Sequence, residues 1–229
     1  MEIIGIGDIH GSQQWRKVIA KEKHADKIIF IADYFDSFYY DTVQQISNFK
    51  SILKLKEDFP DKVELLIGNH CYHYFPYVNE IYAGFQPWAK TDIGELLHNA
   101  VKAGLMKMCH IEGNYLFTHA GITKTWCEKY DIDLNNLEES INDLFIYKPH
   151  SFKFCGHDMS GNDKTQSPIW VRPESLLQDK IDVYTHVVGH TEQKQVMIYK
   201  GMGLILIDTL SLSGQYLKIT DGNPIACKS

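Results

Sequence analysis

Apolar runs that stop abruptly at polar residues recur along the first third of the chain. The runs cover residues 3–6, 27–32 and 63–67. Continuous apolar runs of this length are typical of strands buried on both faces, as in parallel sheets. Between them, apolar residues recur at helical spacing over residues 13–22 and 41–56, with Ser12 and Asp41 as the expected N-caps and Val43 among the inward positions. The pattern predicts strand–helix units of an α/β sheet.

The rest of the chain mixes helices with shorter strands. Asp92 is expected to cap a helix over residues 93–103, and residues 133–145 form a second amphipathic pattern. The run Glu112-Gly113-Asn114 predicts a hairpin turn into a strand, and residues 152–167 read as a polar surface loop. A strand is expected over residues 181–188, and antiparallel strands over 196–199, 203–207 and 215–219. Because no repeat or Pro/Gly/Ser-rich linker divides the sequence, we expect one domain over residues 1–229.

Polar side chains follow each of the first three predicted strands. Asp8 and His10 are two positions apart, so on extended chain they point to the same side. Asp33 follows the second strand, and Asn69 and His70 follow the third. Parallel strands present their carboxyl ends at one edge of a sheet, where α/β proteins bind ligands. One such group is explained by an ordinary turn, but three that mix Asp, Asn and His indicate a cation site.

The order of these residues resembles the calcineurin-like metallophosphoesterase superfamily, and within it the bacterial Ser/Thr phosphoprotein phosphatase and symmetrical diadenosine-tetraphosphatase branch. The first motif is the run Gly7-Asp8-Ile9-His10-Gly11, and later motifs are Thr118-His119-Ala120-Gly121, Val187-Val188-Gly189-His190-Thr191 and Ile207-Asp208-Thr209. The similarity spans about residues 3–219. It implies a metallo-dependent phosphatase-like α/β (α+β) fold, in which a central mixed β-sandwich is flanked by helices in four layers.

The resemblance also implies a centre of two divalent metal ions, with Mn²⁺ expected and Fe or Zn²⁺ as alternatives. Two cations roughly 3.5–4 Å apart can generate hydroxide at neutral pH and hold phosphoryl oxygens for in-line attack. Asp33 would bridge the two ions, and His70, held by Asp36, would protonate the leaving oxygen. On simpler interpretations Asp36 is a helix cap and His119 a core histidine. The implied metal ligands are Asp8, His10 and Asp33 for one ion, and Asp33, Asn69, His119 and His190 for the other.

Two positions depart from the family pattern. Ser37 follows Asp36 where an arginine is usual, and Cys71 follows His70 where an acid is usual. Asn69 and Arg172 are therefore the expected substrate-binding residues, although Arg172 also reads as a surface charge after a strand led by Trp170. Loss of one cationic contact weakens binding of a monoester dianion more than that of a diester.

These features predict a phosphoesterase, most simply a phosphatase of the Ser/Thr phosphoprotein phosphatase type. Its substrate would be a phosphorylated molecule: a phosphoprotein, a nucleotide or a dinucleoside polyphosphate. A nucleotide hydrolase, a dinucleoside-polyphosphate hydrolase or a phosphodiesterase on the same site are alternatives. A silent scaffold is disfavoured because every implied ligand and the acid histidine are present.

Net charge, apolar runs and cysteine content limit which partners and which cellular compartment we expect. The net charge of −6 disfavours a nuclease and other nucleic-acid partners, and the absence of a long apolar run predicts no membrane segment. Five scattered cysteines without a CxxC pair, and no signal peptide pattern, favour free thiols in the cytoplasm.

Overall fold

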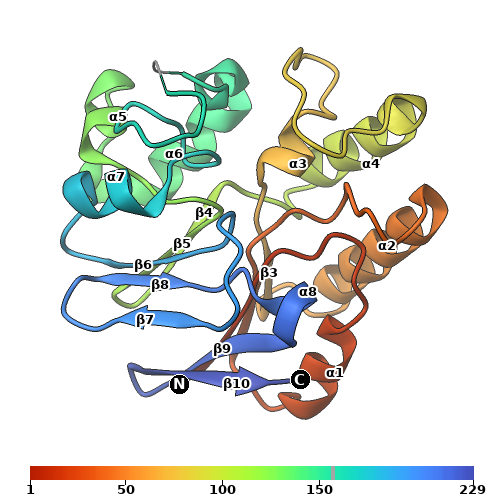
Figure 1. Cartoon of the computed structure of the whole chain (residues 1–229), viewed down its shortest axis with the longest axis horizontal. Helices are drawn as coiled ribbons and strands as arrows, with labels where there is room; N and C mark the ends of the chain where they lie inside the picture. The colour runs from red at the N-terminus through yellow and green to blue at the C-terminus, as the bar shows by residue number, and fades with distance from the viewer. Residues whose placement is uncertain (156–157) are drawn as a thin grey trace.

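In the computed structural model, which describes residues 1–155 and 158–229, the described chain forms two mixed sheets flanked by helices (Figure 1). Within those residues the first sheet has the strand order β10–β9–β1–β2–β3. β1 pairs in parallel with β2, which pairs in parallel with β3, while β9 runs antiparallel to both β1 and β10. The expected parallel units and flanked sandwich are therefore confirmed. The strands are β1 (Glu2–Ile6), β2 (Lys27–Phe30), β3 (Val63–Leu65), β9 (Gln215–Thr220) and β10 (Asn223–Lys228).

The second sheet has the order β4–β5–β6–β8–β7 in the described part of the chain. β4 and β5 form the expected hairpin, and Gly113 in its turn has φ +60°, which glycine adopts without strain. β7 and β8 pair antiparallel, as expected, but β8 also lies parallel to β6, which was not expected. The sheet therefore presents the carboxyl ends of β5, β6 and β8 on one side. Its strands are β4 (Cys109–Glu112), β5 (Tyr115–Thr118), β6 (Thr185–Val188), β7 (Met197–Tyr199) and β8 (Leu204–Leu206).

Helices cover the outer flanks. In Figure 1, α1, α2 and α4 lie on the right, and α5, α6 and α7 lie at the upper left. One apolar cluster includes Ile4 and Phe30 of the first sheet with Leu116, Val187 and Ile205 of the second, so the two sheets share a core. The helices are α1 (Trp15–Lys21), α2 (Thr42–Asp58), α3 (Asn69–Tyr72), α4 (Lys90–Lys102), α5 (Lys124–Lys129), α6 (Leu137–Tyr147), α7 (Pro173–Asp179) and α8 (Leu210–Ser213), with 3₁₀ turns at Pro87–Ala89, Leu134–Asn136 and Pro149–Phe152.

Asp41 caps α2 as the sequence predicts. Its carboxylate accepts the backbone N–H of Gln44 at 2.8 Å, and the Gln44 side chain accepts the N–H of Asp41 at 3.1 Å, which completes a capping box. Two other expected caps are wrong. Gln14, not Ser12, precedes α1, and Asp92 lies inside α4 because the 3₁₀ turn at Pro87 starts the helix earlier. Val43 was expected inward but is 76% exposed, because it lies off the stripe that α2 buries.

The segment before α7 also differs from expectation. Gln166 and Ser167 were placed in a surface loop but are fully buried, and the Gln166 side chain accepts the backbone N–H of Cys155 at 3.1 Å. The residues around Trp170 form a turn that leads into α7 rather than a strand. Residues 156 and 157 of the loop expected over residues 152–167 lie outside the described residues.

Two smaller expectations can be compared directly. The five cysteines are free thiols in the described chain, as expected. None of the described helices combines the length and apolar content needed to cross a bilayer.

Candidate dinuclear metal centre

A cavity of about 190 Å³ lies where the strands of both sheets end. Asp8 and Asp33 reach it from the ends of β1 and β2, while His190 and Asp208 reach it from the ends of β6 and β8. Two sheets therefore deliver side chains to one place, which is the usual location of ligand sites beyond the carboxyl ends of parallel strands. The other cavity-lining residues are His10, Asn69, His70, Tyr82, Ala83, Trp170 and Arg172.

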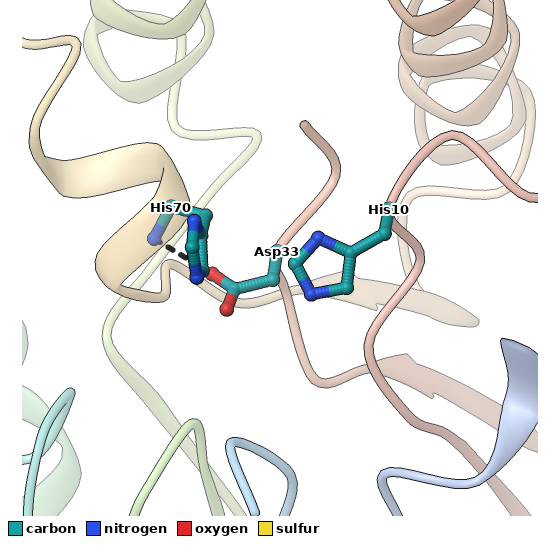
Figure 2. A group of neighbouring side chains, drawn as sticks. All are labelled: His10, Asp33 and His70. Atoms are coloured by element: carbon teal, nitrogen blue, oxygen red, sulfur yellow. Dashed lines mark hydrogen bonds between the residues drawn. The ribbon is translucent and has the colours of Figure 1, made fainter. Parts of the chain in front are cut away.

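Asp33 is shared by two groups of candidate ligands. In each group the ligand atoms lie within 4.8 Å of one another, and the groups are His10 with Asp33 and His70, and Asp8 with Asp33 and His119. Figure 2 shows the Asp33 carboxylate between His10 and His70. One carboxylate oxygen accepts the backbone N–H of His70 at 3.0 Å, and the other lies 3.2 Å from Nε2 of His119. This is the position that a bridging ligand requires.

Backbone carbonyls fix the proton positions on two of the histidines. Nδ1 of His10 lies 2.7 Å from the carbonyl oxygen of Phe35, and Nδ1 of His119 lies 3.1 Å from that of Ile31. A carbonyl only accepts, so each Nδ1 carries the proton and each Nε2 of the neutral ring has a free lone pair. Metal-binding histidines are commonly held this way through the second ring nitrogen. The lone pair of His119 faces the Asn69 amide oxygen at 2.8 Å.

Three buried polar atoms on residues that line the cavity have no hydrogen-bond partner in the described chain: Nδ2 of Asn69, Nε2 of His190 and Nε1 of Trp170. An unpaired buried polar atom costs about 1–3 kcal/mol, so these atoms indicate a binding partner. The neutral His190 nitrogen can bind a cation, whereas the Asn69 and Trp170 nitrogens only donate and can bind an oxyanion. Glycines leave the site open, because a Cβ at Gly189 would lie 2.0 Å from Oδ1 of Asp8 and a Cβ at Gly68 would lie 2.3 Å from Oδ1 of Asp33. The residues present therefore fit a metal centre.

The electrostatics of the cavity agree with this fit. Burial, with Asp208 nearby, raises the pKa of Asp8, and burial, with Asp33 nearby, raises the pKa of Asp208 to about 7. Burial lowers the pKa of His10 and of His190, which keeps both rings neutral. Closely spaced carboxylates with neutral imidazoles form a donor set for divalent cations, which would offset the carboxylate repulsion.

The backbone that carries these side chains is strained. His10, Asp33, Asp36 and His190 have φ between +41° and +65°, in the left-handed region that non-glycine residues seldom adopt. Each such residue costs about 1–3 kcal/mol, and such strain gathers at functional sites. The turns after the strands therefore aim the side chains into the cavity at the expense of stability.

A hydrogen-bonded cluster stands behind His70. One Asp36 oxygen lies 2.8 Å from Nδ1 of His70 and 2.7 Å from Nε2 of His73, and the other accepts the hydroxyl of Tyr74. Burial acts to raise the pKa of Asp36, but the hydrogen bonds from the two histidines lower it. Burial acts to lower the pKa of His70, but Asp33 and Asp36 raise it overall. The result is an oriented imidazole that favours its protonated form.

Arg172 lies at the cavity rather than on an isolated surface. Its Nε donates to the Ser160 carbonyl at 2.9 Å, and one terminal nitrogen donates to the His190 carbonyl at 3.0 Å and to Oγ1 of Thr191 at 3.1 Å. The guanidinium also lies over the Trp170 ring, 5.4 Å from its centroid. These contacts hold a half-buried cation beside the acidic cavity.

The structure brings all the sequence-predicted site residues together, although their roles stay predictions. Seven line the cavity, His119 contacts Asp33 and Asn69, and Asp36 contacts His70. Sequence reasoning gave no site role to Asp208, although it follows an apolar strand just as Asp8 does. The position of His73 near the motif residues made it a candidate for a place beside the ligands or in the pocket, but nothing in the sequence indicated that His73 and Tyr74 both contact Asp36.

The chain belongs to the calcineurin-like phosphoesterase family, whose profile matches residues 1–193. It is therefore a metallophosphoesterase, a hydrolase that acts on phosphate esters and belongs to a family with dinuclear divalent metal centres. Its sequence matches no curated protein significantly.

Solved structures share the fold at low sequence identity. A cold-active protein-tyrosine phosphatase of a psychrophilic Shewanella is 18% identical with a TM-score of 0.61, over 98% of this chain and 77% of that one. A protein serine/threonine phosphatase from Saccharomyces cerevisiae, with similarity to human phosphatase PP5, is 15% identical with a TM-score of 0.60, over 100% and 80%. A putative diadenosine tetraphosphatase is 14% identical with a TM-score of 0.51, over 99% and 92%.

Proposed function

We propose that this chain is a metal-dependent phosphomonoesterase of the phosphoprotein phosphatase type. The observation that carries the proposal is Asp33, whose carboxylate belongs to both candidate ligand groups. Bound cations, which we propose to be Mn²⁺, would neutralise phosphoryl oxygens and lower the pKa of water. The proposed ligands are Asp8, His10 and Asp33 for one ion, and Asp33, Asn69, His119 and His190 for the other.

The remaining site residues have separate tasks in this proposal. Arg172 and Asn69 contact the phosphoryl group, and Arg172 is pre-positioned by its bonds to the His190 carbonyl and Thr191. His70 gives a proton to the leaving oxygen, which its raised pKa favours at neutral pH. Asp36 holds the ring so that Nε2 is free for this transfer. The free thiols are compatible with the reducing cytoplasm.

The proposal is tested by phosphate release from a substrate panel. The panel contains a phosphopeptide, mononucleotides, diadenosine tetraphosphate, and aryl mono- and diesters. Monoester hydrolysis should disappear in chelator and return with Mn²⁺, and Asp33→Asn should not respond to the metal. Full activity of the chelated wild-type protein would refute the metal role.

Hydrolysis of diesters or dinucleoside polyphosphates is the second candidate, favoured by the environment of Ser37. Where an arginine was expected, the Ser37 hydroxyl accepts the backbone N–H groups of Tyr39 and Tyr40 at 3.1 and 3.2 Å. A serine so engaged adds no positive charge for a monoester dianion. Higher kcat/KM for the diester than for the monoester of the same phenol would favour this candidate.

A further inference from the structure

A second, larger pocket of about 590 Å³ adjoins the catalytic cavity. His10, His70 and Ala83 line both, so the two spaces meet at the proposed acid. The leaving oxygen must lie next to His70 to receive a proton. The group attached to that oxygen therefore extends into the larger pocket, whose volume is typical of sites for small molecules.

The wall of this pocket is aromatic. Phe38, Tyr39 and Tyr40 follow Ser37 in the chain and line the pocket, and they are 80%, 92% and 37% exposed. Exposed aromatic side chains gathered at one place usually mark a binding surface. Aromatic rings prefer to contact one another by stacking or edge-to-face packing.

The backbone beneath these rings is held in place. Ser37 accepts the N–H groups of Tyr39 and Tyr40, and Nε2 of Gln45 in α2 donates to the Tyr40 carbonyl at 2.6 Å. The rings themselves are left largely uncovered. A fixed backbone that presents uncovered rings lowers the entropy cost of binding, because less of the chain is ordered when a ligand arrives.

The charge of the pocket disfavours a polyphosphate leaving group. Among its described lining residues none is lysine or arginine, and Glu192 and Asp36 are acidic. A leaving group with further phosphates would place negative charge beside these carboxylates with no lysine or arginine of the lining to pair it. An uncharged ring meets no such penalty.

We propose that this pocket binds the uncharged aromatic leaving group of an aryl phosphate monoester, such as the phenol ring of phosphotyrosine. The proposal rests on the phosphomonoesterase function above. The oxygen of a water molecule bonds to phosphorus while the bond from phosphorus to the aryl oxygen breaks. That oxygen takes the proton of His70, the water proton passes to solvent, and solvent reprotonates His70. The products are a phenol and inorganic phosphate.

The test compares the two leaving-group classes in one protein. With Mn²⁺ bound, the double variant F38A/Y39A should lose about tenfold or more in kcat/KM for O-phosphotyrosine, and less than twofold for O-phosphoserine. The retained phosphoserine rate shows that the variant is folded. Tyr147→Ala is the matched control, because Tyr147 is a 78% exposed aromatic on α6 outside both cavities.

Two further substrates test whether the pocket contacts the phenol ring itself or the peptide chain that carries it. A tyrosine-phosphorylated peptide and phenyl phosphate carry the same phenol group, and a loss with both in the double variant supports the ring pocket. A loss with the peptide alone would place the contact on the peptide chain and overturn the proposal. Equal losses for phosphotyrosine and phosphoserine would overturn it as well. If the wild-type protein with Mn²⁺ hydrolyses no ester, the phosphomonoesterase proposal itself fails.

Discussion

Asp36 holds the His70 ring through its nitrogen Nδ1, and His73 and Tyr74 in turn hold Asp36. This arrangement orients a proton donor and contributes nothing to holding the phosphoryl group. We therefore expect His70→Asn to keep its metals while kcat falls by about 10²–10⁴-fold for esters of poor leaving groups. For esters of good leaving groups kcat should fall much less, because their leaving oxygen departs without needing a proton.

The measurement is kcat for a series of aryl phosphates of increasing phenol pKa, together with metal content. The dependence of log kcat on phenol pKa should steepen in the variant. A variant that matches the wild-type rate on the poorest leaving group would show that His70 is not the acid.

Arg172 is a half-buried cation at the cavity edge. We expect Arg172→Ala to raise KM for phosphomonoesters by about tenfold, because a charge-assisted hydrogen bond is worth about 1.5–3 kcal/mol. The effect on a monoanionic diester should be smaller. Arg16→Ala is the control, since Arg16 also lies over a tryptophan ring but sits on the exposed face of α1. An unchanged KM would show that Arg172 does not bind the phosphoryl group and has a structural role only.

At the residue scale, the sequence identified site residues that follow strand ends, but it did not predict which residues contact one another in the fold. Asp8, Asp33 and His190 could be singled out because each follows an apolar run, and the structure places them around one cavity. His73 could be singled out as a residue near the site, but its partner Asp36 could not be foreseen, because the contact spans 37 positions and depends on how α3 follows β3. Its sequence neighbourhood contains several other aromatic and histidine residues with no distinguishing spacing.

At the element scale, the hydrophobic pattern predicted where most strands occur and that β1, β2 and β3 pair in parallel, but it did not predict every pairing. β8 has the expected position, but its parallel partner β6 is chosen by the connection between them, which the pattern does not encode. β10 was missed because most of its residues are exposed and it shows no apolar alternation. α7 was missed because the apolar residues before Arg172 suggested a strand, whereas Pro173 begins a helix there.

His186 in β6 should make the stability of the fold depend on pH. It is fully buried, one ring nitrogen lies 3.3 Å from the Ile181 carbonyl, and the other has no partner in the described chain. Burial lowers its pKa to about 4. Below pH 6.5 the unfolded chain binds a proton that the folded chain excludes, so stability should fall as the pH drops from 6.5 to about 4.

The expected loss is up to about 3 kcal/mol, at about 1.4 kcal/mol per pKa unit. The free energy of unfolding, measured in urea with chelator at several pH values, should lose this much of its pH dependence in His186→Leu. His24→Leu is the control, because His24 is exposed. If His186→Leu kept the wild-type slope between pH 6.5 and 4, burial of this ring would not be the cause.

At the scale of the whole molecule, both sheets direct acidic side chains into one cavity. Asp8, Asp33 and Asp208 meet there on strained or tightly turned backbone, so the fold without cations carries carboxylate repulsion at its centre. Cations that bind the folded state alone would stabilise it by about 2.7 kcal/mol at a hundredfold excess over Kd. For a chain of this size, that corresponds to about 5–10 °C in Tm.

We therefore expect two substitutions to respond differently to the metal. In chelator above pH 7, Asp208→Asn should be more stable than the wild-type protein, because burial and the nearby Asp33 raise the pKa of Asp208 to about 7 and its charged form therefore destabilises the fold. Asp33→Asn should gain no such stability, because burial acts to raise the pKa of Asp33 but His119 and His70 lower it overall. With Mn²⁺, Asp33→Asn should gain little, because the variant has lost the shared ligand, whereas Asp208→Asn should keep most of the Mn²⁺ response, since Asp208 is outside the proposed ligand set.

Thermal unfolding of the three proteins, with chelator and with Mn²⁺, measures both effects. A wild-type Tm that does not change with Mn²⁺ would contradict metal binding at this cavity. If Asp33→Asn kept the full Mn²⁺ shift, the cations would bind without the bridging carboxylate. If Asp208→Asn lost the Mn²⁺ shift entirely, Asp208, which follows β8, would itself be a metal ligand and would belong to the proposed centre.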